Sequence, residues 1–236
     1  MIVLHWDTHR IYLRPFYLNE CRTYLKEHGF EWSDYQILQC YMIFGGVPYY
    51  LSLLRPYLSL PENVDALIFK RGGNLCDEFK ELYNALFSKA DRYVAIVKLL
   101  ATKREGFTFE EICLWHLPHI KFGLGIAGIA TESSLWRFTP SKDDPRGGAQ
   151  IDLVIKRADK IIHLVEMKFS EGSYTISKDY ERRLQERKQL FMSVTGITHG
   201  VVHTFITPSG ITRGVHSAFI HSQLTANDLF ADLPSR

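Results

Sequence analysis

The sequence lacks a long uncharged hydrophobic run. Its most apolar region, residues 112–130, is interrupted by His116, Pro118, His119 and Lys121, whereas a membrane-spanning helix needs about 20 predominantly apolar residues. The chain begins Met-Ile-Val-Leu-His-Trp-Asp and lacks the longer apolar core of a secretory signal peptide. We therefore expect no membrane partner.

The sequence also lacks a strong net charge and a cysteine framework. Lys and Arg total 28 against 26 Asp and Glu, for a net charge of +2, so any site for a polyanion must be local. The 4 cysteines are scattered, with no Cys-x-x-Cys pair. This pattern favours reduced thiols in a cytoplasmic protein over disulfides or a zinc site.

A phosphate-binding loop of the form Gly-x-x-x-x-Gly-Lys-Ser/Thr is missing as well. The pairs Gly45-Gly46 and Gly72-Gly73 are not followed by the lysine and hydroxyl residue that such a loop requires. The chain is therefore not expected to hydrolyse ATP by itself.

What is present is enough apolar material for a packed core, 46% of 236 residues, in one large domain or two small ones. Hydrophobic spacing divides the chain into a mostly helical domain, residues 1–102, and a mixed domain, residues 103–236. The first domain predicts a strand over 9–13 and helices over 18–28, 34–44, 75–87 and 92–101. The second predicts a helix from Thr108 to about Phe122, strands over 134–138, 149–157 and 161–169, a helix over 179–195 and a strand over 201–207. The fold class is therefore α/β (α+β).

The informative stretch contains two adjacent predicted strands, Gly148-Ala-Gln-Ile-Asp152-Leu-Val-Ile and Ile161-Ile-His-Leu-Val-Glu166-Met-Lys168. A three-residue connection over 158–160 pairs Arg157 with Ile161, which sets Asp152 opposite Glu166. Alternation then places Asp152, Glu166 and Lys168 on one face of the sheet. The opposite, buried face is expected to hold Ile151, Leu153, Ile155, Val165 and Met167.

Two facing carboxylates on apolar strands are costly, because like charges and burial both disfavour ionisation. A divalent cation relieves this cost, and hard oxygen ligands of this kind suit magnesium. A magnesium ion at Asp152 and Glu166 would stabilise charge on a phosphate, with Lys168 close enough to hold a phosphate oxygen or position water. The plainer alternative is a solvated carboxylate–lysine pair at a strand end.

These residues resemble the PD-(D/E)XK superfamily of restriction-endonuclease-like nucleases. The resemblance lies in Asp152, Glu166-Met167-Lys168, the glycine-rich entry into the Asp strand and the αβββαβ order. It implies Mg²⁺- or Mn²⁺-dependent hydrolysis of DNA, with Asp152, Glu166 and the Met167 backbone carbonyl as metal ligands. It also implies a carboxylate on the first helix, with Glu110 preferred over Glu111. It further implies a polar residue on the later helix that could contact nucleic acid, with Arg187 preferred and Lys188 and Gln185 as the alternatives.

A second resemblance extends over nearly the whole chain. Residues 8–100, including Tyr41-Met-Ile-Phe-Gly-Gly-Val-Pro-Tyr-Tyr-Leu, resemble the end and helical lid of archaeal-type prokaryotic AAA+ ATPases that carry a C-terminal PD-(D/E)XK domain. The segment from Phe109 to Gly128 and Ser177-Lys-Asp-Tyr180 are similar to that C-terminal domain. The ATPase core and the middle winged-helix region are missing, so the resemblance implies a truncated member.

Two functions therefore follow from the sequence. The first is a metal-dependent (endo)deoxyribonuclease built on Asp152, Glu166, Lys168 and Glu110. The second is a catalytically inactive remnant that serves as a DNA-binding or protein-interaction module, with an ATPase or other protein as partner. Convergence of Asp152, Glu166 and Lys168 in an open cleft would favour the first, and a plugged cleft the second.

Overall fold

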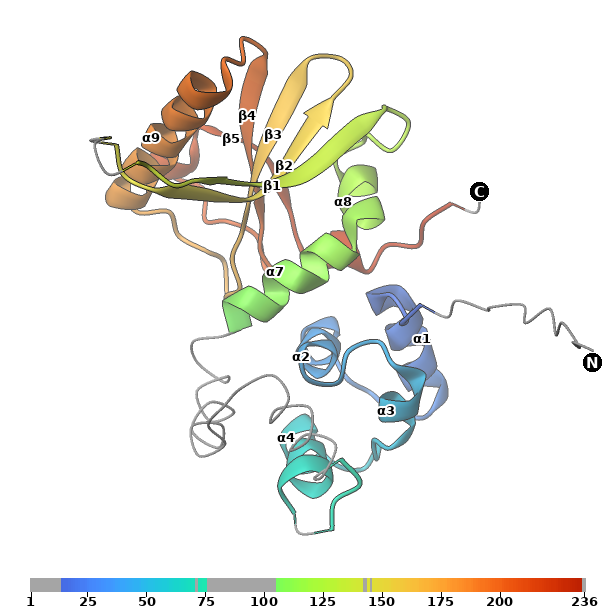
Figure 1. Ribbon diagram of the computed structural model, residues 1–236. Helices are drawn as coiled ribbons and strands as arrows, with labels where there is room; N and C mark the ends of the chain where they lie inside the picture. The colour runs from blue at the N-terminus through green and yellow to red at the C-terminus, as the bar shows by residue number, and fades with distance from the viewer. Residues whose placement is uncertain (1–13, 71, 76–104, 142–143, 145, 235–236) are drawn as a thin grey trace, which may run out of the picture.

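The computed structural model describes residues 14–70, 72–75, 105–141, 144 and 146–234, in which helices precede a five-stranded mixed sheet (Figure 1). The helical elements are α1 (Leu18–Glu27), α2 (Asp34–Phe44), α3 (Pro48–Ser52), α4 (Leu60–Val64), the π-helical turn η1 (Asp65–Phe69), α7 (Glu105–Trp115), α8 (Leu117–Gly123), α9 (Lys178–Thr195), the 3₁₀ turn η2 (Val215–Ser217) and α10 (Ala226–Leu229). The strands are β1 (Thr131–Phe138), β2 (Ala149–Arg157), β3 (Ile161–Met167), β4 (Gly200–Ile206) and β5 (Ile220–Leu224). The fold is thus of the α+β class.

The element order of the second half agrees with the sequence pattern. Helix, three strands, helix and strand follow one another from α7 to β4. The predicted start of the first helix at Thr108 was wrong. Helix α7 begins at Glu105, so Thr108 lies within the helix and does not cap it. The expected single helix to Phe122 is broken at His116, with Pro118 in the first turn of α8. The strand expected over 9–13 and the helix over 92–101 lie outside the described residues, as does nearly all of the helix over 75–87.

The β2–β3 hairpin has the predicted register. Leu153 pairs with Val165 and Lys156 with Ile162, which continues to Arg157 opposite Ile161 and Asp152 opposite Glu166. Lys160 closes the three-residue connection with a φ of 69°, the left-handed conformation that such loops use at their last position. The turn therefore fixes which residues face each other across the hairpin.

A bulge in β2 corrects one expectation about its buried face. On β1, Ser134 pairs with Val154 and Trp136 with Ile151, so one residue of β1 faces two of β2. The extra residue reverses the alternation. Ile151 consequently packs with Val154, Leu164 and Phe191, and not with Leu153 and Ile155 as the sequence pattern predicted.

The sheet lies between two helical layers, with α9 on one face and α7 on the other (Figure 1). Leu153, Ile155, Val165 and Met167 join Phe109 and Ile112 of α7 in one cluster. Val154, Ile162 and Leu164 meet Phe191 of α9 in another. Both faces of β2 and β3 are therefore buried, which is why these strands read as continuous apolar runs.

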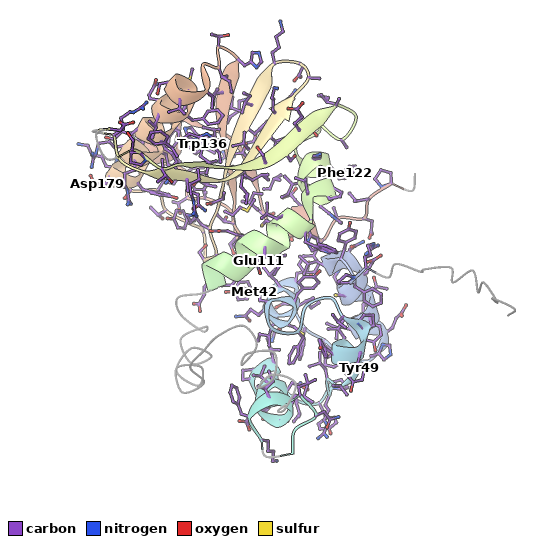
Figure 2. All side chains as sticks on the ribbon, viewed as in Figure 1. Met42, Tyr49, Glu111, Phe122, Trp136 and Asp179 are labelled. Carbon is purple, nitrogen blue, oxygen red and sulfur yellow. The ribbon has the colours of Figure 1, made fainter. Side chains whose placement is uncertain are left out.

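The N-terminal helices pack below α7, and they share the larger cluster with the sheet (Figure 1). Figure 2 shows Met42 of α2 and Glu111 of α7 on these neighbouring helices. Ser33 begins α2 with a reciprocal capping box to Gln36, and Gly45 ends it with a φ of 65°, which explains why the sequence signals placed this helix correctly. Among the described residues no helix is long and apolar enough to cross a membrane.

Candidate metal and nucleic-acid site

The strands β2 and β3 carry the candidate carboxylates to the edge of an open cleft of about 640 Å³. The residues lining it come from the β1–β2 loop, from β2, from the end of β3 and from α9: Arg146, Gly147, Gly148, Ala149, Gln150, Asp152, Glu166, Lys168, Tyr180, Arg183, Glu186, Arg187 and Leu190. The sequence-predicted residues Asp152, Glu166, Lys168 and Arg187 are thus brought together in one cavity.

Lys168 lies at the centre of this group. Its Nζ is 3.5 Å from Asp152 Oδ2 and 3.6 Å from Glu166 Oε2, and it donates to the Met167 carbonyl over 3.1 Å. Burial alone would lower the pKa of Lys168, but Glu166, Asp152 and Glu110 together raise it above its ordinary value. The ammonium group is therefore a hydrogen-bond donor in this state and not a base.

Asp152 is held by the backbone of the next strand. Its Oδ2 accepts from the Met167 N–H over 3.1 Å. This contact lies one step beyond the last paired residues, Leu153 and Val165. A side-chain oxygen thereby satisfies a buried backbone donor and orients the carboxylate toward the Met167 peptide.

Glu166 is almost fully buried, with 3% of its surface exposed, and a carboxylate at such a position needs charged or hydrogen-bonding partners. Arg187 donates to its Oε1 and the Tyr180 hydroxyl donates to its Oε2. Burial and Glu166 raise the pKa of Tyr180 far above its ordinary range, so this hydroxyl remains a donor. Two side chains of helix α9 thus hold the Glu166 carboxylate in place through hydrogen bonds.

Glu110 approaches the same group from α7. Burial raises the pKa of Glu110 to about 6, reinforced by Asp152 and Glu166 against the opposing effect of Lys168. Glu111, the next residue on α7, is exposed (Figure 2). Of the two glutamates that the sequence offered, Glu110 is the one whose charge interacts with the site.

The three α9 residues predicted for nucleic acid separate in space. Arg187 lines the cleft. Lys188 lines a much smaller cavity behind Glu166, next to Ile151 and His203. Gln185 is half-buried and lines neither cavity. The structure therefore brings only Arg187 of this set to the cleft.

Sequence reasoning missed Arg146, Arg183 and Tyr180 as parts of the cleft. Arg183 stacks on the Tyr180 ring, with its guanidinium carbon 5.3 Å from the centroid. The signal was available for α9, because Tyr180, Arg183 and Arg187 follow helical spacing and so share one face. No such signal exists for Arg146, whose position depends on the path of the β1–β2 loop.

The oxygen atoms of this group include the kind of donors that a metal ion needs. No group of three or more His, Cys, Asp or Glu side chains in the described part of the chain is arranged to hold one. Magnesium, however, commonly binds one or two carboxylates and keeps several waters. Asp152, Glu166 and the Met167 carbonyl meet around Lys168, and this donor set fits magnesium.

Comparisons with known proteins leave the family open. No protein-family model matches the chain, and no curated protein does. One similar solved structure is the crystal structure of a protein of unknown function, AF1548, with a TM-score of 0.32 and 16% sequence identity. The match covers 47% of this chain and 56% of that chain, so the chain spans little more than half of its length.

Proposed function

We propose that the cleft hydrolyses DNA phosphodiester bonds with Mg²⁺ or Mn²⁺ as cofactor. The observation that carries this proposal is the convergence of Asp152, Glu166 and Lys168 at the wall of an open cleft. Two carboxylates and a lysine in this arrangement agree with the PD-(D/E)XK resemblance of the sequence.

Asp152, Glu166 and the Met167 carbonyl would hold the metal. When bound, the ion would offset the negative charge that develops on the phosphate and lower the pKa of a bound water. Lys168 is protonated and close to both carboxylates, so its role is to donate to a phosphate oxygen or to orient water. Glu110, with a pKa of about 6, can accept or release a proton near neutral pH.

The arginines supply the local positive charge that the overall composition lacks. Arg146, Arg183 and Arg187 line the same cleft, and guanidinium groups match the geometry of phosphate oxygens. Arg146 is paired with Asp144, and both lie in the loop that enters β2. A nucleic-acid backbone in the cleft would therefore meet an arginine on each wall, from the loop and from α9.

The test is cleavage of supercoiled and linear duplex DNA with Mg²⁺ or Mn²⁺. Asp152→Asn and Lys168→Gln are expected to abolish cleavage while the protein stays folded. Glu111→Gln changes an exposed glutamate next to Glu110 and is expected to cleave like wild type. Cleavage by Asp152→Asn at the wild-type rate would overturn the proposal, as would equal loss in Glu111→Gln.

A second candidate is a nuclease-like module without catalysis that binds DNA or a partner protein such as an ATPase. The observation that favours it is that Lys168 and Arg187 already neutralise the two carboxylates. This alternative predicts DNA binding by gel shift that is unchanged in Asp152→Asn, with no cleavage under any metal condition.

A further inference from the structure

Both oxygens of the Glu166 carboxylate are engaged by cations or donors of the protein itself. Arg187 donates to Oε1, Tyr180 donates to Oε2, and Lys168 Nζ lies 3.6 Å from Oε2. A divalent cation that binds Glu166 must therefore compete with at least one of these groups.

Arg187 is the group best placed to leave. Tyr180 is uncharged, and each carboxylate oxygen can accept more than one bond, so Tyr180 can remain while a metal binds. Lys168 contacts Asp152, Met167 and Glu166, the same groups that would hold the metal, so its ammonium group must shift as the metal binds but stays in the cleft as a donor. Among the described residues Arg187 has a single acceptor, Glu166, and its positive charge would lie directly beside the metal.

The Arg187 side chain also has an alternative position in the open cleft. Its side chain is 24% exposed and forms part of the wall of the open cleft, beside Arg183. A phosphate in that cleft would offer the guanidinium group a charged, bidentate acceptor. The move from Glu166 to phosphate would exchange one charge-assisted contact for another within the reach of a long side chain.

We propose that Arg187 is an exchangeable cap on Glu166, which together with Lys168 weakens metal binding in the free protein and leaves Glu166 when a nucleic-acid phosphate binds. This inference rests on the proposed function. It requires that DNA and the divalent cation bind cooperatively, and linkage makes the effect reciprocal. The free protein then binds metal weakly, and the ligand set becomes available only where substrate is present.

The experiment measures Mn²⁺ affinity of the full chain from the electron paramagnetic resonance signal of free Mn²⁺, with and without a short DNA duplex. In wild type the duplex is expected to tighten Mn²⁺ binding by about tenfold, a typical coupling between two sites. Arg187→Gln is expected to bind Mn²⁺ about tenfold more tightly without DNA and to lose most of the effect of the duplex.

Two further variants keep the test decisive. Arg187→Lys retains a charge and is expected to keep the weak Mn²⁺ binding of wild type. Arg182→Gln removes an exposed arginine of the same helix that pairs with Glu186 and Asp179, and it is expected to behave like wild type. Thermal unfolding of each variant separates a lost fold from a changed site.

If wild type and folded Arg187→Gln both bind Mn²⁺ and the variant binds it no more tightly, the cap is overturned. A wild-type Mn²⁺ affinity that is the same with and without DNA would also overturn it. Failure of the proposed function has a different signature. In that case neither wild type nor Arg187→Gln binds Mn²⁺, or Asp152→Asn binds it as well as wild type in both conditions.

Discussion

Asp152 accepts a hydrogen bond from the backbone N–H of Met167, with 3.1 Å between Oδ2 and the nitrogen. Backbone pairing of β2 and β3 extends to Leu153 and Val165, and the side chain takes over the next position. The bulge in β2 lies at the same point. Strand bulges recur beside active sites because they change the direction of a side chain. Asp152 is thus fixed beside Glu166 by the fold itself.

Two replacements of Asp152 should therefore differ in their effect on the stability of the fold. Asp152→Ala leaves the Met167 N–H without its acceptor at a fully buried residue, and we expect the free energy of unfolding to fall by about 1–3 kcal/mol. Asp152→Asn keeps an oxygen at this position and should be closer to wild type. Urea unfolding of both variants checks this, and equal stabilities would contradict the structural role of the carboxylate.

Tyr180 should stabilise the fold through Glu166. Tyr180→Phe removes a donor to a carboxylate that is 3% exposed, so we expect a loss of about 1–3 kcal/mol in unfolding free energy. Tyr57 is 76% exposed, and Tyr57→Phe is the matched control, expected to change stability by less than about 0.5 kcal/mol. Similar unfolding midpoints for Tyr180→Phe and wild type would contradict the contact.

His116 should make stability sensitive to acid. Its Nε2 accepts from the Leu18 N–H over 2.9 Å, which joins α1 to the break between α7 and α8. Burial lowers the pKa of His116 to about 4, so the unfolded chain takes up a proton first as the pH falls. Its contribution is fully present above the ordinary histidine pKa of about 6.5 and is lost toward pH 4.

Burial also lowers the pKa of His163 and of His203 to about 4, and these two act in the same direction. For His116 the expected loss is about 2 kcal/mol between pH 7 and pH 5. Urea unfolding at both pH values should show a smaller decrease for His116→Gln, whose amide oxygen can still accept from Leu18. An unchanged decrease in that variant would contradict the role of His116.

Gly46 should tolerate no side chain. An added Cβ would lie 2.2 Å from the Phe16 carbonyl oxygen and 2.9 Å from the Phe16 nitrogen, in a segment where Phe16 N–H donates to Gly46. We expect Gly46→Ala to lose at least about 3 kcal/mol in unfolding free energy. Gly128→Ala meets nothing within 4 Å and is the control, with near-wild-type unfolding expected.

The hairpin and its register could be predicted because local signals agree. The three-residue connection, the alternation in β2 and β3 and the caps of α2 each require only neighbouring residues. Ile151 could not be placed, because the bulge that reverses it depends on the pairing of β2 with β1. The short strand β5 and helix α10 were missed, since Ile220–Leu224 is brief and rich in polar residues.

In the candidate site, too, features set by local spacing could be predicted, whereas features set by the packing of distant elements could not. Strand spacing was enough to bring Asp152 and Glu166 together, whereas Glu110 was expected only from the family resemblance, which implies a carboxylate on the first helix. The contact of Arg187 with Glu166 could not be predicted, because it depends on how α9 lies across the sheet. The turn of Lys188 toward a different cavity has the same cause.

The most direct test is Mn²⁺ binding by wild type and Asp152→Asn, measured with and without a DNA duplex. A site formed by Asp152 and Glu166 predicts that Asp152→Asn binds Mn²⁺ more weakly in both conditions. The decrease in Mn²⁺ affinity should exceed the roughly tenfold effect of removing a residue that only hydrogen-bonds to a metal ligand. Equal Mn²⁺ affinity in wild type and folded Asp152→Asn would contradict the metal site, and with it the proposed nuclease chemistry.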